Sequence, residues 1–297
     1  MHGLELGDRI RLAHAALQAT ADGVGADVLH IKGYASMPGL YRVDRVSTDA
    51  DVLVRPEHLQ RFLGALREQG WEVVAHFDSG SAFQHAMTLR HPWWGPADIH
   101  RHFPGILRDP SAAFELLWSS HERIPIAHLP CAVPQVLDQI LVLLIHAGRD
   151  GVRGRHDVHH LMRILSAEDV AILRSRAQVL QCTLALATAL GELESFRGHR
   201  DYLLWKVISQ GGSRLQEWEA RFRAARSLGD RLRLLRSMVH VNRDHLAMRL
   251  GHEPSEQELR AEAARRRRRA LRELGAAAAR RVRGVSAVAR GWIGRRR

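Results

Sequence analysis

At 297 residues the chain is long enough for two domains, or for one domain with a helical extension, and its apolar content of 45% is ordinary for a globular protein. It contains no run of about 18 apolar residues and begins with a polar, acidic segment, so we expect no membrane-spanning helix and no secretory signal. Cys131 and Cys182 fit no metal-binding or redox spacing, and we expect free thiols in a cytoplasmic protein.

The net charge of +12 comes from the C-terminal end of the chain. Residues 260–297 contain fourteen arginines and two glutamates, so residues 1–259 are neutral overall. Such a basic tail suits contact with nucleic acid, an anionic membrane surface or an acidic protein, and a solvated tail without a partner is an equal alternative. The rest of the chain has no excess of basic charge of the kind that marks a nucleic-acid-binding protein.

The first part of the chain alternates predicted helices and strands. Apolar residues recur at helical spacing after residue 4, and Gly23 and Gly25 mark the end of that helix. In chain order we expect a helix at 4–22, a strand at 28–31, a short helix and loop at 34–46, a strand at 51–54, a helix from 56 to about 69, a strand at 71–77 and paired strands at 85–91 and 97–102. Together they predict a small mixed sheet with helices on one face.

From about Ser111 the apolar period becomes helical and stays so. The segment 134–148 is nearly all apolar and is predicted to be a buried helix. Ser255 and Glu258 have the spacing of a capping box at the start of a last helix. The expected helices are 111–120, 134–148, 157–165, 167–179, 181–195, 200–209, 214–226, 229–249 and 255–275.

Two carboxylates, Asp49 and Asp51, stand at the start of the predicted strand 51–54. Because side chains alternate faces along a strand, the two point the same way. Like charges side by side repel unless a cation lies between them, and hard ions such as Mg²⁺ bind carboxylate oxygens. The pair therefore indicates a metal site, although so short a pattern also fits a solvated strand end or a turn with a side-chain-to-backbone hydrogen bond.

Two neighbouring segments favour the metal site. The strand 28–31 runs into Lys32 and Gly33, where glycine permits a sharp turn and a close approach of backbone to a ligand. Asp98 and His100 alternate in the same way on a later predicted strand. A turn followed by two carboxylates, and by a third on another strand, is the set that two-metal phosphoryl transfer needs.

These motifs follow one another in a fixed order: Ile31-Lys32-Gly33, Tyr41, Arg45, Asp49-Ala50-Asp51-Val52-Leu53-Val54 and Asp98-Ile99-His100. The order resembles that of the uncharacterised nucleotidyltransferase family within the DNA polymerase β-like superfamily. The resemblance covers residues 25–105 and continues more weakly through a helical segment with His146 and Asp157. Arg101 stands where the family has an aromatic residue.

The resemblance implies roles for the acidic residues and for the turn. The catalytic residues would be Asp49, Asp51 and Asp98, which would also be the ligands of two Mg²⁺ ions. Mn²⁺ is the alternative metal. Asp98 would in addition take the proton of the acceptor hydroxyl. Lys32 and Gly33 would meet the triphosphate through an ammonium group and backbone N–H groups.

Four more residues are candidates for nucleotide binding, each with a structural alternative. Ser36 would add a hydroxyl to the phosphate site or would begin a helix. Arg45 would reach a phosphate or pair with a neighbouring aspartate. His100 would orient the third carboxylate or the acceptor, or be a hydrogen-bonded sheet histidine. Asp157 would close the pocket from the helical domain or lie on a polar helix face.

The sequence thus predicts an α+β fold, with a mixed-sheet nucleotidyltransferase domain at 1–108, an all-helical domain covering the cleft at 109–258 and an Arg-rich helical or disordered tail at 259–297. The expected reaction is Mg²⁺-dependent transfer of a nucleoside monophosphate group from a nucleoside triphosphate, ATP being the first choice, with release of pyrophosphate. The resemblance implies a small molecule or a modified peptide as acceptor, in natural-product biosynthesis, and the basic tail allows RNA or a protein as the acceptor instead. The alternative is a catalytically silent nucleotide- or nucleic-acid-binding, antitoxin-like module, against which the intact carboxylate trio argues.

Overall fold

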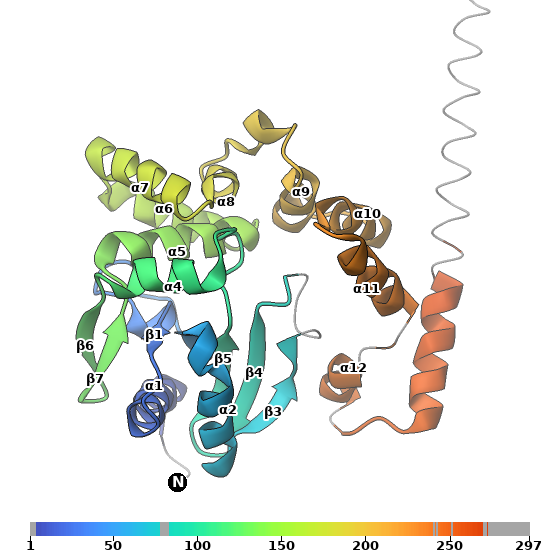
Figure 1. Cartoon of the computed structure of the whole chain (residues 1–297), viewed down its shortest axis with the longest axis horizontal. Helices are drawn as coiled ribbons and strands as arrows, with labels where there is room; N and C mark the ends of the chain where they lie inside the picture. The colour runs from blue at the N-terminus through green and yellow to red at the C-terminus, as the bar shows by residue number, and fades with distance from the viewer. Residues whose placement is uncertain are drawn as a thin grey trace, which may run out of the picture. The chain divides into compact units, whose positions relative to one another are not determined.

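The computed structural model describes residues 4–77, 83–239, 241, 243–250, 252–269 and 272. By its internal contacts the chain divides into two compact units, Met1–Ala224 and Ala225–Arg297 (Figure 1). All the candidate site residues named above lie in the first unit. The predicted domain boundary between residues 108 and 109 falls inside this unit and stays a prediction.

A five-stranded mixed sheet forms the centre of the first unit, with the strand order β1-β2-β5-β4-β3. The strands β2 and β5 run parallel, and the other neighbours in this sheet run antiparallel. The bounds are β1 (Val28–His30), β2 (Ala50–Val54), β3 (Glu72–Ala75), β4 (Ala86–His91) and β5 (Gly95–His100). The predicted α+β fold and its strands are confirmed, including the antiparallel pair β4–β5.

Because side chains alternate along the strands, each face of this sheet packs in a different apolar core. Val52 of β2 and Ile99 of β5 pack in the core that includes α1 (Leu6–Gly23) and α2 (Leu59–Glu68). Leu53 faces the other way and packs with the helices that follow the sheet in sequence. Figure 1 shows the two layers on either side of the sheet. The sheet is therefore covered on both faces, whereas the sequence indicated helices on one face of it.

Helices make up most of the remainder of the first unit. Residues Ile140–Ile145 of α5 are all buried, which confirms the predicted buried helix. A helix predicted over 181–195 is shorter in the structure, because Gly191 takes a φ of +78° soon after α8 ends. The bounds are α4 (Pro110–Trp118), α5 (Val136–Arg149), α6 (Arg155–Ile164), α7 (Ala167–Val179), α8 (Thr183–Ala189), α9 (Tyr202–Gln210) and α10 (Arg214–Ala224), with 3-10 turns at η1 (Gly33–Ala35), η2 (Pro56–His58) and η3 (Leu193–Phe196).

Residues 122–133 correct the expectation that the chain is helical from Ser111 onward. They form an antiparallel hairpin, β6 (Glu122–Ile126) with β7 (Leu129–Val133). Its turn residues, Ala127 and His128, have φ values of +48° and +65°. Two-residue hairpin turns need this left-handed backbone, which Gly, Asn or Asp usually supplies. Because none of these stands at the turn, the sequence carries no hairpin signal there.

The second unit contains α11 (Leu228–Val239), α12 (Arg243–Leu250) and a helix over 256–269. The single helix predicted over 229–249 is thus two helices. The predicted capping box is confirmed, since the N–H of Ser255 donates to Oε2 of Glu258 at 2.8 Å and the N–H of Glu258 donates to Oγ of Ser255 at 3.3 Å. The basic tail beyond residue 272 lies outside the described residues. In the described part of the chain, no helix has both the length and the apolar character that a bilayer crossing requires.

Candidate active site

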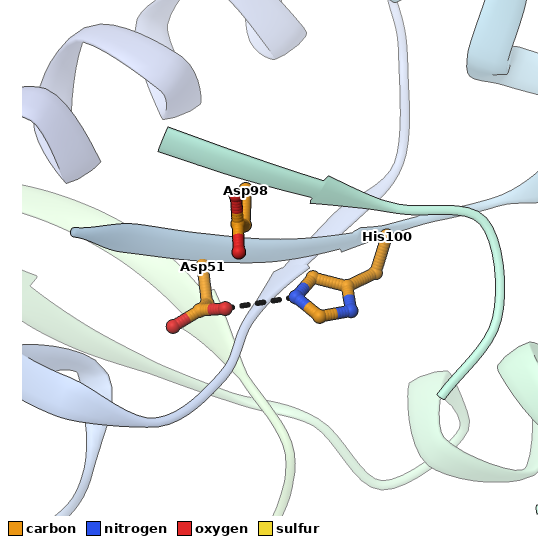
Figure 2. A group of neighbouring side chains, drawn as sticks. All are labelled: Asp51, Asp98 and His100. Atoms are coloured by element: carbon orange, nitrogen blue, oxygen red, sulfur yellow. Dashed lines mark hydrogen bonds and ion pairs between the residues drawn. The ribbon is translucent and has the colours of Figure 1, made fainter. Parts of the chain in front are cut away.

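The parallel pairing of β2 with β5 brings two of the predicted carboxylates to neighbouring positions. In this register Asp51 lies opposite Asp98, and Leu53 lies opposite His100. All four side chains therefore point to the face of the sheet opposite α1 and α2. The ligand atoms of Asp51, Asp98 and His100 lie within 4.8 Å of one another (Figure 2).

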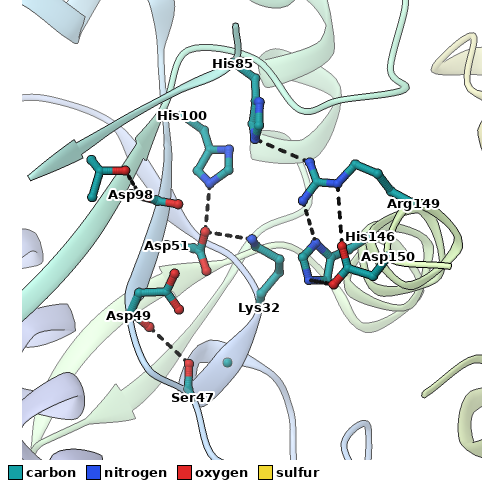
Figure 3. A network of polar contacts seen from close by, with 12 residues as sticks. Lys32, Ser47, Asp49, Asp51, His85, Asp98, His100, His146, Arg149 and Asp150 are labelled. Atoms are coloured by element: carbon teal, nitrogen blue, oxygen red, sulfur yellow. Dashed lines mark hydrogen bonds and ion pairs between the residues drawn. The ribbon is translucent and has the colours of Figure 1, made fainter. Parts of the chain in front are cut away.

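Asp51 is the most fully engaged of these carboxylates. Its Oδ1 accepts hydrogen bonds from Nζ of Lys32 at 2.7 Å and from Nε2 of His100 at 2.8 Å (Figure 3). Burial alone would raise the pKa of Asp51, but the ammonium of Lys32 and the hydrogen bond from His100 outweigh it and hold the pKa below its ordinary value. Asp51 is therefore a permanent anion at neutral pH.

A cross-strand hydrogen bond fixes Asp98. Thr88 of β4 lies opposite Asp98 in the antiparallel register, and its Oγ1 donates to Oδ1 of Asp98 at 2.6 Å. The second carboxylate oxygen keeps its lone pairs for another partner. This arrangement orients Asp98 toward Asp51 without neutralising its charge.

Asp49 lies just before β2, two residues from Asp51, so the alternation of the strand directs both side chains to one side, and Figure 3 shows the two carboxylates near each other. Burial, followed by the charges of Asp51 and Asp98, raises the pKa of Asp49 from 3.8 to about 6, and the charge of Lys32 opposes this rise. Three acidic side chains thus compete for one positive charge.

This excess of negative charge is suited to binding a divalent cation. Asp49, Asp51 and Asp98 offer carboxylate oxygens, the ligand type that Mg²⁺ and Mn²⁺ prefer. The raised pKa of Asp49 shows that its anion lacks compensation from the protein alone. The nitrogen of His100 lies near enough to be counted with the group, but it already donates to Asp51.

The Lys32–Gly33 turn has the backbone geometry that the sequence predicted. Both residues lie in the left-handed region, with φ values of +61° and +53°. The N–H of Gly33 donates to the hydroxyl of Tyr41 at 3.3 Å. A Cβ on Gly33 would come within 2.4 Å of Oγ of Ser47, which itself donates to the carbonyl of Asp49 at 3.0 Å. Glycine is therefore required here, both for its conformation and for the close approach to the Asp49 segment.

We expect Gly33→Ala to raise the KM for the nucleotide about tenfold and to destabilise the fold by about 2 kcal/mol, because the new methyl group must displace Ser47 from its contact with the Asp49 backbone. Gly25→Ala is the matched control, since Gly25 has a similar φ of +63° but open space around its Cβ position. It should cost about 1 kcal/mol and leave KM unchanged. Steady-state kinetics and thermal unfolding measure both effects, and an equal KM in the two variants would contradict this role for the turn.

A cavity of about 460 Å³ opens beside the turn. Of the residues predicted from sequence, Lys32, Gly33, Ser36, Arg45, Asp49 and Asp51 line it. Within the described part of the chain, the buried Oγ of Ser36 has no hydrogen-bond partner, so it is placed to donate to a ligand. The other lining residues are Arg11, Tyr34, Met37, Pro38, Gly39, Tyr41, Val46, Ser47, Thr48 and His146.

Asp98, His100 and Asp157 do not line this cavity. The first two lie behind Asp51 on the sheet. Asp157, on α6, is buried and accepts from Nη1 of Arg45 at 2.5 Å. The Arg45 guanidinium also lies over the ring of Tyr41, with its carbon 4.8 Å from the ring centroid. Asp157 therefore acts on the cavity through Arg45, which it holds at the wall.

Several polar residues near the site had no clear signal in the sequence. Arg149, Asp150 and His85 form a group of polar contacts with His146, which the sequence places only in the weaker, helical part of the family resemblance (Figure 3). Arg149 and Asp150 stand at the end of α5, where basic and polar residues are common for helix-capping reasons alone. Only the fold shows that they face Lys32.

The mixed sheet, the paired carboxylates and the cavity beside a glycine turn are those of a nucleotidyltransferase. The chain belongs to the family described as uncharacterised nucleotidyltransferase, whose sequence profile matches residues 15–198. This confirms the family resemblance of the motifs and identifies the chain as an enzyme of the nucleotidyltransferase class. No curated protein matches the chain.

Three solved structures are similar at a distance. The lincosamide antibiotic adenylyltransferase LnuA, with lincomycin bound, is 18% identical, with a TM-score of 0.36 over 52% of this chain and 96% of its own. The antibiotic-resistance factor ANT(2'')-Ia is 18% identical, with a TM-score of 0.42 over 61% and 96%. An antigenic nucleotidyltransferase-like protein from Paracoccidioides brasiliensis is 14% identical, with a TM-score of 0.36 over 62% and 93%.

Proposed function

We propose that this enzyme transfers a nucleoside monophosphate group from a nucleoside triphosphate, ATP being the first choice, to an oxygen or nitrogen of an acceptor, and releases pyrophosphate. The observation that carries the proposal is the register of β2 and β5, which places Asp51 beside Asp98 next to the Lys32–Gly33 turn and its cavity. Family membership supports the reaction class.

Asp49, Asp51 and Asp98 would hold two divalent cations, Mg²⁺ or in its place Mn²⁺. When bound, these ions neutralise phosphate charge and align the attacking and leaving oxygens. The three carboxylates are suited to this task because two are held in place by hydrogen bonds from Thr88 and His100, while the third, Asp49, has an anion that the protein does not fully compensate.

The triphosphate would lie in the cavity against the turn. Gly33 would let the phosphates approach the backbone closely, the hydroxyl of Ser36 would donate to their oxygens, and Lys32 would contribute a positive charge. Arg45, held by Asp157, would contact a phosphate from the opposite wall.

In the transfer step the acceptor atom forms a bond to the α-phosphorus. The bond from the α-phosphorus to the bridging oxygen breaks, and pyrophosphate leaves with that electron pair. Where the acceptor is a hydroxyl, Asp98 takes its proton through the oxygen that Thr88 does not engage. This is the base role that the family resemblance implies for Asp98.

For the acceptor we propose a chemical class. A small molecule, a modified peptide or a protein, in natural-product biosynthesis, fits the reaction, and a cytoplasmic location would supply both ATP and Mg²⁺. The Arg-rich tail would contact nucleic acid, an anionic membrane surface or an acidic protein through its positive charge.

The purified full-length chain, incubated with Mg²⁺ and each of the four α-labelled nucleoside triphosphates, tests the proposal. We expect ATP to raise the thermal unfolding temperature in the presence of Mg²⁺, and we expect pyrophosphate release with the label transferred to an acceptor or, slowly, to water. Glu72→Gln, which alters an exposed carboxylate on the edge strand β3, should behave as the wild type. Absence of both nucleotide binding and pyrophosphate release with all four nucleotides would refute the proposal.

A further inference from the structure

Beside the carboxylates, a partly buried guanidinium, that of Arg149, lies between two histidines. Nη1 of Arg149 lies 3.4 Å from Nε2 of His85, and its Nη2 lies 3.1 Å from Nδ1 of His146. Nε2 of His146 in turn lies 3.4 Å from a carboxylate oxygen of Asp150. His146, Arg149 and Asp150 stand at the end of α5, whereas His85 immediately precedes β4, so the cluster joins the sheet to the helical layer.

The protonation states in this cluster follow from the donors. An arginine only donates, so both imidazole nitrogens must accept and both rings are neutral. Burial lowers the pKa of His85 to about 2, with the charge of Arg149 contributing, and lowers that of His146 well below its ordinary value. The histidines therefore orient Arg149 and leave its positive charge intact.

Arg149 differs in this from the other partly buried arginines of the first unit that form close ion pairs. Arg45 meets Asp157 at 2.5 Å, and Arg176 meets Asp138 at 2.7 Å. Among the described residues, the carboxylate that Arg149 contacts is that of Asp150, whose Oδ1 lies 3.9 Å from Nε of Arg149, too far for a hydrogen bond. A partly buried cation whose close partners among the described residues are neutral is poised for an anion that is not part of the chain.

The cluster also faces the site. His146 lines the cavity together with Lys32 and Asp51. Figure 3 shows Lys32 between the carboxylates of Asp49 and Asp51 on one side and His146 with Arg149 on the other. Asp51 and Asp98 are near enough to influence the pKa of Arg149, which burial lowers and these carboxylates raise. An anion at Arg149 would therefore lie across Lys32 from the carboxylates of Asp49 and Asp51.

We propose that Arg149, oriented by His85 and His146, binds a carboxylate or phosphate group of the acceptor, so that the substrate class of this transferase is an anionic acceptor. The inference rests on the proposed function, because it assumes that the nucleotide occupies the Gly33 side of the cavity. The planar guanidinium is suited to binding an oxyanion. Each η nitrogen carries two N–H groups and donates one of them to an imidazole, so the second N–H of each can donate to the anion.

Calorimetric titration of the full-length protein, loaded with Mg²⁺ and α,β-methylene-ATP, tests the proposal with inorganic phosphate and acetate as separate probes. We expect one of these anions to bind the loaded wild type with a Kd on the order of 1 mM, the choice showing whether the natural group is a phosphate or a carboxylate. Arg149→Met should weaken that binding about tenfold or more, and Arg149→Lys, which keeps the charge but loses the planar fork, should weaken it less. Affinity for α,β-methylene-ATP should stay within about threefold in each variant.

Asp150→Asn gives the opposite sign. This substitution removes the negative charge that lies beside Arg149. Because the side chain of Asp150 is 39% exposed, the variant should fold. It should bind the anion about twofold to threefold more tightly than the wild type. A merely structural role of Arg149 would not produce opposite changes in the two variants. The proposal is overturned if the loaded wild type binds neither anion, if Arg149→Met binds as the wild type does, or if Asp150→Asn weakens binding. Failure of the wild type to bind the nucleotide with Mg²⁺ would instead refute the proposed function.

Discussion

Replacing Asp98 with asparagine should lower the rate of nucleotidyl transfer by about a thousandfold or more while leaving the fold intact. The amide keeps the size of the side chain, and its oxygen still accepts the hydrogen bond from Thr88. What is lost is a negative charge next to Asp51 and the only acceptor we assign for the proton of the acceptor hydroxyl. Single-turnover measurement of pyrophosphate release with saturating ATP and Mg²⁺ records the effect.

The Asp98→Asn measurement needs a control for charge and one for folding. Glu72→Gln removes a carboxylate from the exposed edge of the same sheet and should retain full activity. Circular dichroism and the thermal unfolding temperature of Asp98→Asn should match the wild type within about 2 °C, because no buried ion pair is broken. A variant that keeps a tenth or more of the activity would exclude Asp98 from the catalytic step.

Asp51 is a less discriminating target, although it lies closer to the cavity. Its carboxylate is the partner of Lys32, whose side chain is only 9% exposed. Removing the charge of Asp51 would leave that ammonium buried without a counter-ion, and breaking a buried pair in this way destabilises proteins by about 3–5 kcal/mol. A loss of activity in an Asp51 variant would thus mix catalysis with folding, whereas Asp98 has a neutral partner and separates the two.

The sequence was sufficient for what depends on local pattern. Alternation along a strand put Asp49 and Asp51 on one side, and the left-handed turn at Gly33 follows from the need for close backbone approach. The same alternation put Asp98 and His100 together. That Asp98 sits opposite Asp51 is a matter of strand pairing, which joins residues far apart in the chain and is not encoded in either segment alone.

Two features show why the remainder could not be predicted. The β6–β7 hairpin turns at Ala127 and His128, which adopt a backbone that no turn-forming residue announces. Arg149 occupies the last turn of α5, where an arginine is expected for its favourable interaction with the helix dipole. Its position between two histidines depends on His85, which immediately precedes β4 and is far from α5 in the sequence. Tertiary contact, and not helix periodicity, gives both features their significance.

Asp49→Asn should make the metal-free protein more stable at pH 7.5 and at the same time abolish its response to Mg²⁺. Burial and the charges of Asp51 and Asp98 raise the pKa of Asp49 from 3.8 to about 6. The folded state therefore holds the proton more tightly than the unfolded state does, so the contribution of Asp49 to stability is present below about pH 4 and is lost as the pH rises through about 6. At pH 7.5 the wild type carries this cost in full, and the asparagine variant does not.

With allowance for the partial exposure of Asp49, the gain in the free energy of unfolding should be about 1–2 kcal/mol, or about 2–4 °C in the unfolding temperature. The difference between variant and wild type should shrink as the pH falls to 5, where the carboxyl is mostly protonated in the wild type. Scanning calorimetry in a chelating buffer, and again with Mg²⁺, measures it. Mg²⁺ should stabilise the wild type alone, because the ion compensates a repulsion that the variant has already lost. An equal response of both proteins to Mg²⁺, or a variant less stable than the wild type at pH 7.5, would mean that Asp49 is not a metal ligand and that its raised pKa reflects burial alone.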